Sequence, residues 1–105
     1  MKNYDIYSTE DFDREMNSLE KIEQERINKL FLKLKENPYT GDPLSYKFFR
    51  EKRINGKRVY FLIFDDFNAV LFVAFSDKKT QQETIDSVIN KIDQFKFYLK
   101  EKIKG

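Results

Sequence analysis

Basic side chains gather on one stretch of this sequence. Between Lys47 and Arg58 the segment KFFREKRINGKR carries six cations and one acid, Glu51. Such a cluster suits a phosphate-bearing partner, because arginine directs a planar fork of N–H groups at phosphate oxygens and lysine supplies a point charge. The same cations also suit an exposed strand that must stay soluble and must not pair with another chain. Charge alone leaves both interpretations open.

The positive charge is local rather than global. The 105 residues contain 20 basic and 18 acidic side chains, which gives a net charge of +2. Residues 1–36 hold nine acids and seven bases, whereas residues 37–64 hold two acids and six bases. An anionic partner would therefore be attracted to the middle of the chain.

Composition excludes several classes of enzyme. The sequence has no cysteine and no histidine, so the usual zinc ligands and the usual general base are missing, and we expect no metal and no cofactor. The N-terminal residues carry charges where a signal peptide needs an apolar run, and no segment approaches the roughly 20 apolar residues of a membrane span. We expect a cytoplasmic protein without membrane attachment. The chain length of 105 residues predicts a single domain that spans residues 1–105.

A small sheet must position the cations. Residues 48–76 are typical of three antiparallel strands joined by two tight turns. The first turn contains Asn55-Gly56, a strong hairpin signal because both central residues of a type I′ turn take positive φ. The second turn, residues 65–68, is Asp-Asp-Phe-Asn, which tolerates turn geometry. Residues 59–64 and 69–75 are almost continuously apolar, which predicts strands covered on both faces.

Two helices are predicted before this sheet. A first strand at Lys2–Tyr7 is followed by a helix that begins at Ser8-Thr9, with a hydroxyl at the N-cap and acids in its first turn, and runs to about Glu20. A second amphipathic helix carries the apolar stripe Ile22, Ile27, Leu30, Phe31 and Leu34. We expect these helices to form a hairpin on one face of the sheet, linked to it by the two prolines of residues 36–44.

One long helix is predicted at the C-terminus, from Gln81 to Ile103, after a polar turn at residues 76–80. Its apolar stripe is Ile85, Val88, Ile89, Ile92, Phe95, Leu99 and Ile103. The helix hairpin can cover only one of two apolar sheet faces, so this helix is expected to cover the other. The predicted class is α+β: a small antiparallel sheet, made of the N-terminal strand and a three-stranded meander, with a two-helix hairpin and a long helix at about 80–103.

This order of elements resembles the RelE/ParE superfamily of toxins from type II toxin-antitoxin modules. The resemblance spans roughly residues 4–84 and rests on the segments KLKENPYTGDPL and FREKRINGKRVYFLIFDD. It implies a cognate antitoxin as partner and three candidate functions. The first, which we favour, is a RelE-like mRNA interferase that acts with the ribosome and mRNA. The others are a ParE-like inhibitor of DNA gyrase and a catalytically inactive relative that mainly binds its antitoxin.

The resemblance also assigns residues to the interferase chemistry, in which a ribose 2′-oxygen attacks the adjacent phosphate. The family's two basic strand positions fall on Arg50 and Lys52, its arginine after the turn on Arg58, and its basic residue beyond the last strand on Lys78 or Lys79. We expect Lys52 to be the base, because arginine stays protonated. Arg58 and Lys78 are expected to stabilise the phosphorane, and Arg50 to contact RNA.

Further RNA contacts are expected from Arg53, Lys57, Lys79 and Tyr60. Tyr60 is of interest because this chain has Gln82-Glu83-Thr84 where RelE-type enzymes place a C-terminal tyrosine. It follows Arg58 by two positions, on the same side of the strand, and is a candidate acid or base-stacking platform. The alternative is a core tyrosine with its hydroxyl at the rim.

The acid within the basic cluster has its own expectation. Glu51 alternates with Arg50 and Lys52 along the strand, so it points to the opposite face. We expect it to form an ion pair with Arg53 or with a neighbour at the sheet edge.

Overall fold

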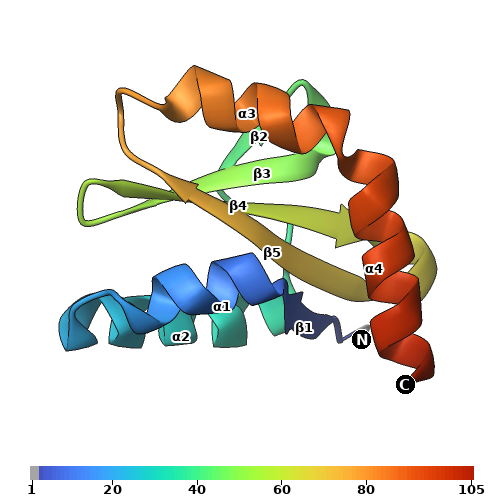
Figure 1. Cartoon of the computed structure of the whole chain (residues 1–105). Coiled ribbons are helices and arrows are strands. Elements are labelled where there is room, and N and C mark those ends of the chain that lie inside the picture. The colour runs from blue at the N-terminus through green and yellow to red at the C-terminus, as the bar shows by residue number, and fades with distance from the viewer. Residues whose placement is uncertain (1–2) are drawn as a thin grey trace.

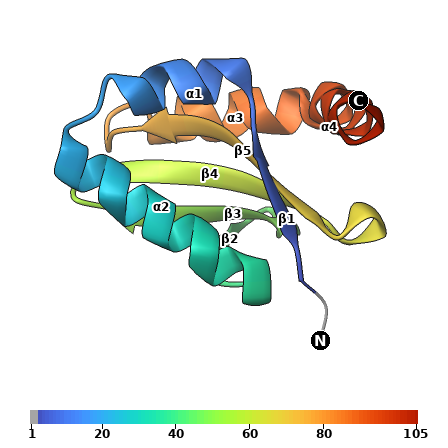
Figure 2. The same cartoon turned by 90° about the horizontal axis from the view of Figure 1, so that it is seen from below.

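The computed structural model describes residues 3–105, which form a five-stranded sheet with helices on both faces (Figures 1 and 2). The strand order is β1-β5-β4-β3-β2. The elements are β1 (Asp5–Ser8), α1 (Glu10–Asn17), α2 (Lys21–Glu36), β2 (Asp42–Leu44), β3 (Tyr46–Ile54), β4 (Lys57–Phe64), the 3-10 turn η1 (Asp65–Phe67), β5 (Ala69–Ser76), α3 (Gln81–Asn90) and α4 (Ile92–Lys104). The predicted α+β class is confirmed.

The central meander has the predicted connections. β3 pairs antiparallel with β4, and β4 with β5. Asn55 and Gly56 have φ values of 52° and 82°, as a two-residue type I′ hairpin loop requires. At the second turn Asn68 has φ 47° after η1, a left-handed conformation that asparagine tolerates better than most residues. Turn chemistry therefore fixed the position of both turns.

The two outer strands differ from the prediction. β1 pairs with β5 in parallel, so the sheet is mixed rather than wholly antiparallel. β2 lies within residues 36–44, which were predicted as a link, and pairs antiparallel with β3. This extra strand reverses the chain once more before β3, so that β3 and β5 run in the direction of β1. Lys2, the predicted start of the first strand, lies outside the described residues.

The helix hairpin covers one face, as predicted. The hydroxyl of Thr9 accepts the Phe12 N–H at 3.1 Å and caps α1, which ends at Asn17, before the predicted Glu20. The buried apolar side chains of α1 and α2 are Phe12, Ile27, Leu30 and Leu34, and they pack on Val59, Phe61, Val70 and Phe72. Figure 2 shows both helices on this side of the sheet.

The C-terminal helix covers the other face but is not continuous. The chain breaks at Lys91, where φ is −114° and ψ is 10°, and α4 leaves in a direction steeply inclined to α3 (Figure 1). α3 buries Ile85 and Val88, and α4 turns so that Leu99 is fully buried and the Tyr98 hydroxyl lies 3.3 Å from the Ser8 carbonyl, to which it donates. A straight helix would have carried these side chains past the sheet. No helix among residues 3–105 is long and apolar enough to cross a membrane.

Candidate functional site

A row of polar side chains crosses the sheet beneath the start of α3. Arg53 of β3 is the direct partner of Arg58 on β4, and Arg58 is the partner of Ser76 on β5. Glu51 faces Tyr60, two residues further along the same strands. Directly opposed residues share a face of the sheet, so all five side chains belong to the face that α3 covers. We call Glu51, Arg53, Arg58, Tyr60 and Ser76 the polar row.

Glu51 and Arg58 form a buried ion pair within this row. Nε of Arg58 lies 3.1 Å from Oε1 of Glu51, and the two side chains are 8% and 3% exposed. The Nε–H is not directed at the oxygen, so the contact is ionic rather than a hydrogen bond. Glu51 thus points away from Arg50 and Lys52, as expected, but its partner is Arg58 rather than Arg53 or an edge neighbour. It offsets the repulsion between Arg53 and Arg58, which face each other directly.

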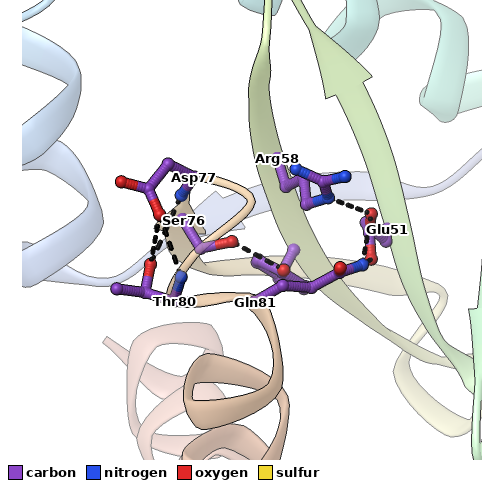
Figure 3. A network of polar contacts seen from close by, with 7 residues as sticks. Glu51, Arg58, Ser76, Asp77, Thr80 and Gln81 are labelled. Atoms are coloured by element: carbon purple, nitrogen blue, oxygen red, sulfur yellow. Dashed lines mark hydrogen bonds and ion pairs between the residues drawn. The ribbon is translucent and has the colours of Figure 1, made fainter.

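Gln81, the first residue of α3, completes the contact. Its Nε2 lies 2.9 Å from Oε2 and 3.2 Å from Oε1 of Glu51 and donates to this carboxylate (Figure 3). A tight turn precedes the helix, in which the Thr80 N–H donates to Oδ1 of Asp77 at 2.9 Å. That bond to the charged form lowers the pKa of the Asp77 carboxyl. The start of α3 is therefore fastened to β3, thirty positions earlier in the chain.

Tyr60 occupies the core rather than a surface. Its side chain is fully buried, and its hydroxyl lies 2.7 Å from Oγ of Ser76. Burial raises the pKa of the Tyr60 phenol. In this conformation the ring offers no free face on which a base could stack, so the geometry fits the core alternative stated above.

Arg50 is also enclosed, on the opposite face of the sheet. Its guanidinium donates to three backbone carbonyls: Thr40 at 3.0 Å, Lys47 at 3.1 Å and Gly41 at 3.2 Å. Gly41 has φ +74°, and a Cβ at this position would lie 2.4 Å from the backbone oxygen of Glu51. Arg50 therefore ties the segment before β2 to β3. These three bonds use three of the five guanidinium N–H groups, so the expected RNA contact would have to use the remaining two.

Lys52 lies on the same face as Arg50. Its direct partner is Val59, which belongs to the core under α1 and α2. Side chains alternate along a strand, so residues 50 and 52 fall on one face and residues 51 and 53 on the other. The structure does not bring Lys52 and Arg58 together.

Three other cations lie near Arg58, and a fourth, Lys57, lies at the same turn but on the opposite face, because its direct partner Ile54 belongs to the core under α1 and α2. Arg53, Lys78 and Lys79 are exposed, and Lys57 is half-buried. The β3–β4 turn and the β5–α3 turn lie at the same end of the sheet (Figure 1), so Arg53, Lys78 and Lys79 lie at the outer end of the polar row. We call Arg53, Lys78 and Lys79 the basic rim. Nη1 and Nη2 of Arg58 donate no hydrogen bond to any residue within 3–105.

Sequence reasoning missed the roles of Glu51 and Gln81. A signal for the first was present: a two-residue loop at Asn55-Gly56 sets Arg53 opposite Arg58 and Glu51 opposite Tyr60. That register already places Arg58 with Glu51. No local signal pointed to Gln81, because its contact depends on where α3 lands.

The fold is a small α+β architecture similar to that of RelE toxins. Solved structures of RelE from E. coli share it: a doubly substituted RelE in the free state has a TM-score of 0.69 and 13% identity, over 81% of this chain and 92% of that one. The intact E. coli RelBE toxin-antitoxin complex matches with a TM-score of 0.65 and 15% identity, over 70% of this chain and 95% of that one.

RelE in complex with a peptide of its antitoxin RelB gives a TM-score of 0.66 at 15% identity, over 80% of this chain and 95% of that one. No family model and no curated protein matches the sequence. At these identities the likeness shows the fold.

Proposed function

We propose that this chain is the toxin of a type II toxin-antitoxin pair and that it acts on RNA. The shared fold supports the first part, together with the RelE structures that hold their antitoxin. The observation that carries the second part is Arg58. This arginine is fixed by Glu51, its terminal nitrogens donate to none of the described residues, and the basic rim lies beside it.

The proposed reaction is mRNA cleavage in the ribosome. A ribose 2′-oxygen bonds to the adjacent phosphorus, and the P–O bond to the 5′-oxygen of the next nucleotide breaks. Water takes the 2′-proton and supplies a proton to the leaving 5′-oxygen. Arg58 stabilises the extra negative charge of the phosphorane, because a fixed guanidinium in a buried setting needs little reorganisation when that charge develops. Lys78, two residues beyond the end of β5, supplies a second positive charge. Arg53 and Lys79 bind neighbouring phosphates of the RNA, and Lys57 contacts RNA from the other face of the β3–β4 hairpin.

The faces of the sheet change two roles within this proposal. Lys52 lies on the face opposite Arg58. It therefore contacts RNA from that face and is not the general base for a reaction at Arg58. Arg50 holds the backbone before β2 and contributes to the site through the fold.

A second candidate function is favoured by the same separation. The burial of Tyr60 and the position of Lys52 on the face opposite Arg58 leave fewer acid–base groups at Arg58 than an interferase of the RelE type employs. A toxin that inhibits DNA gyrase, or a relative that mainly binds its antitoxin, needs a charged surface without such groups.

Induction in cells distinguishes these functions. The wild type and the Arg58→Lys variant are expressed, and incorporation of labelled methionine is followed together with plasmid supercoiling. Arg58→Lys keeps the charge that pairs with Glu51 but loses the fork for phosphate. We expect translation to fail first in the wild type and much later in Arg58→Lys, with cut mRNA on ribosomes. A loss of supercoiling before translation would support gyrase inhibition instead.

A further inference from the structure

We infer that Gln81 is a positioning residue for Arg58 and that it acts through Glu51. The inference rests on the proposed function, since it names what holds the phosphate-binding arginine in place. The three side chains come from three elements: Gln81 from α3, Glu51 from β3 and Arg58 from β4 (Figure 3).

The first step is the orientation of the carboxylate. The terminal torsion of a glutamate is broad, so a carboxylate with one partner can rotate. Nε2 of Gln81 lies within 3.2 Å of both oxygens of Glu51, which fixes that rotation. Oε1 is the oxygen that Arg58 also contacts, at 3.1 Å. Gln81 thus decides where the charge that faces Arg58 lies.

The second step is the guanidinium. Arg58 lies directly opposite Arg53, and like charges across a strand pair repel. Its Nε is buried and has no hydrogen-bond partner, and Glu51 is its ion-pair partner among residues 3–105. If the Glu51 carboxylate rotates, Arg58 loses the ion pair that offsets its repulsion from Arg53. A misplacement of about 1 Å in such a group is enough to lower a rate by about a hundredfold.

The third step is the rigidity of α3. Its start is held by Thr80, whose N–H and hydroxyl both donate to Oδ1 of Asp77, at 2.9 and 3.0 Å. Its buried face is anchored by Ile85 and Val88 in the core. Gln81 therefore stands on a fixed base and connects the C-terminal helix to the arginine.

The decisive experiment is a double-mutant cycle on cleavage of ribosome-bound mRNA. The variants are Gln81→Ala, Glu51→Gln and the double substitution, and Gln82→Ala is the matched control because Gln82 bonds to Asp86 on the outside of the same helix. We expect Gln81→Ala to lower kcat on the order of 10- to 100-fold, with KM for ribosomes nearly unchanged. Gln82→Ala should change neither. In the Glu51→Gln background the Gln81 substitution should have no further effect.

Additive losses in the cycle, or a Gln81→Ala enzyme with wild-type kcat, would overturn the inference. If Gln81→Ala does not fold, Gln81→Met keeps the side-chain volume and is measured in its place.

A second readout separates this inference from the proposed function. The Nε–H of Arg58 is buried, so its proton should exchange slowly with water in the wild type and in Gln82→Ala. This exchange is followed by NMR of protein labelled with nitrogen-15. In Gln81→Ala we expect exchange to become at least about tenfold faster as local opening increases. If the wild type cuts no RNA but Nε–H exchange is still faster in Gln81→Ala than in the wild type, the proposed function is refuted and the contact is supported. An unchanged Nε–H signal in Gln81→Ala overturns the positioning role whatever the activity.

Discussion

Glu51 and Arg58 approach to 3.1 Å across β3 and β4, and both side chains are more than nine-tenths buried. A charge left alone in such a place is costly, whereas an apolar pair of similar volume is tolerated. The fold is therefore expected to be stable with both charged partners or with an apolar pair in their place, and to be destabilised when only one charge remains.

Removing one partner should show this dependence. We expect Arg58→Met to lower the free energy of unfolding by about 3–5 kcal/mol, because Glu51 remains buried without its cation. Arg58→Met combined with Glu51→Leu should recover most of that loss, measured by urea unfolding. Both proteins should be non-toxic. A double variant as unstable as Arg58→Met would show that packing, and not charge, governs this site.

The basic rim should give RNA binding a strong salt dependence. Each phosphate contact on a single strand contributes about −0.7 to the slope of log K against log salt, because counterions are released. We expect Lys78→Ala and Lys79→Ala each to reduce the steepness by about that amount, as measured by titration of a non-cleavable single-stranded RNA. Lys100→Ala, an exposed substitution on α4, is the control. Affinity that does not change with salt would remove the rim from the binding site.

The C-terminal helices should be structural. Leu99 is fully buried, and Leu99→Ala is expected to cost about 2–5 kcal/mol of stability. Phe97, on the same helix, is 66% exposed, and Phe97→Ala should stay within about 0.5 kcal/mol of the wild type. Thermal or urea unfolding tests both. Truncation after Asp77 should leave an insoluble or molten protein, and a truncated chain that is monomeric and unfolds cooperatively would identify the helices as an appended arm.

Alkaline pH should loosen a clamp at the other end of the sheet. The hydroxyls of Tyr4 and Tyr39 both donate to Asp65, at 2.7 and 2.5 Å. The pKa of Tyr39 is raised by burial and then by this bond, and the pKa of Tyr4 is raised chiefly by its bond. A raised pKa means that the folded state holds the proton more tightly, so stability is fully present below about pH 10 and declines as pH rises further.

The decline is measured by urea unfolding between about pH 8 and 11, across the ordinary tyrosine pKa. Tyr39→Phe should show a smaller decline than the wild type. Tyr46→Phe, at an exposed ring, should match the wild type. Equal slopes in all three proteins would mean that the clamp does not contribute.

Local signals in the sequence determined much of the fold. Asn55-Gly56 fixed the hairpin because few other residues accept positive φ at two successive positions. The apolar runs of β4 and β5 required covers on both faces, and both covers are present. The register that follows from the turn even places Arg58 opposite Arg53 and away from Lys52. These features depend on residues within a few positions of one another.

Tertiary structure decided the rest, because it depends on contacts between distant residues. β1 takes its direction from its pairing with β5, far along the chain, and β2 is held in place by its pairing with β3. The break at Lys91 lets α3 and α4 each bury side chains in the core of the second face. The site depends on the same long-range packing. Arg50 is buried because three backbone carbonyls converge on it, and Gln81 meets Glu51 because α3 is anchored through Ile85 and Val88. The sequence shows which residues carry charge, but tertiary packing decides which of these charges faces a partner and which faces water.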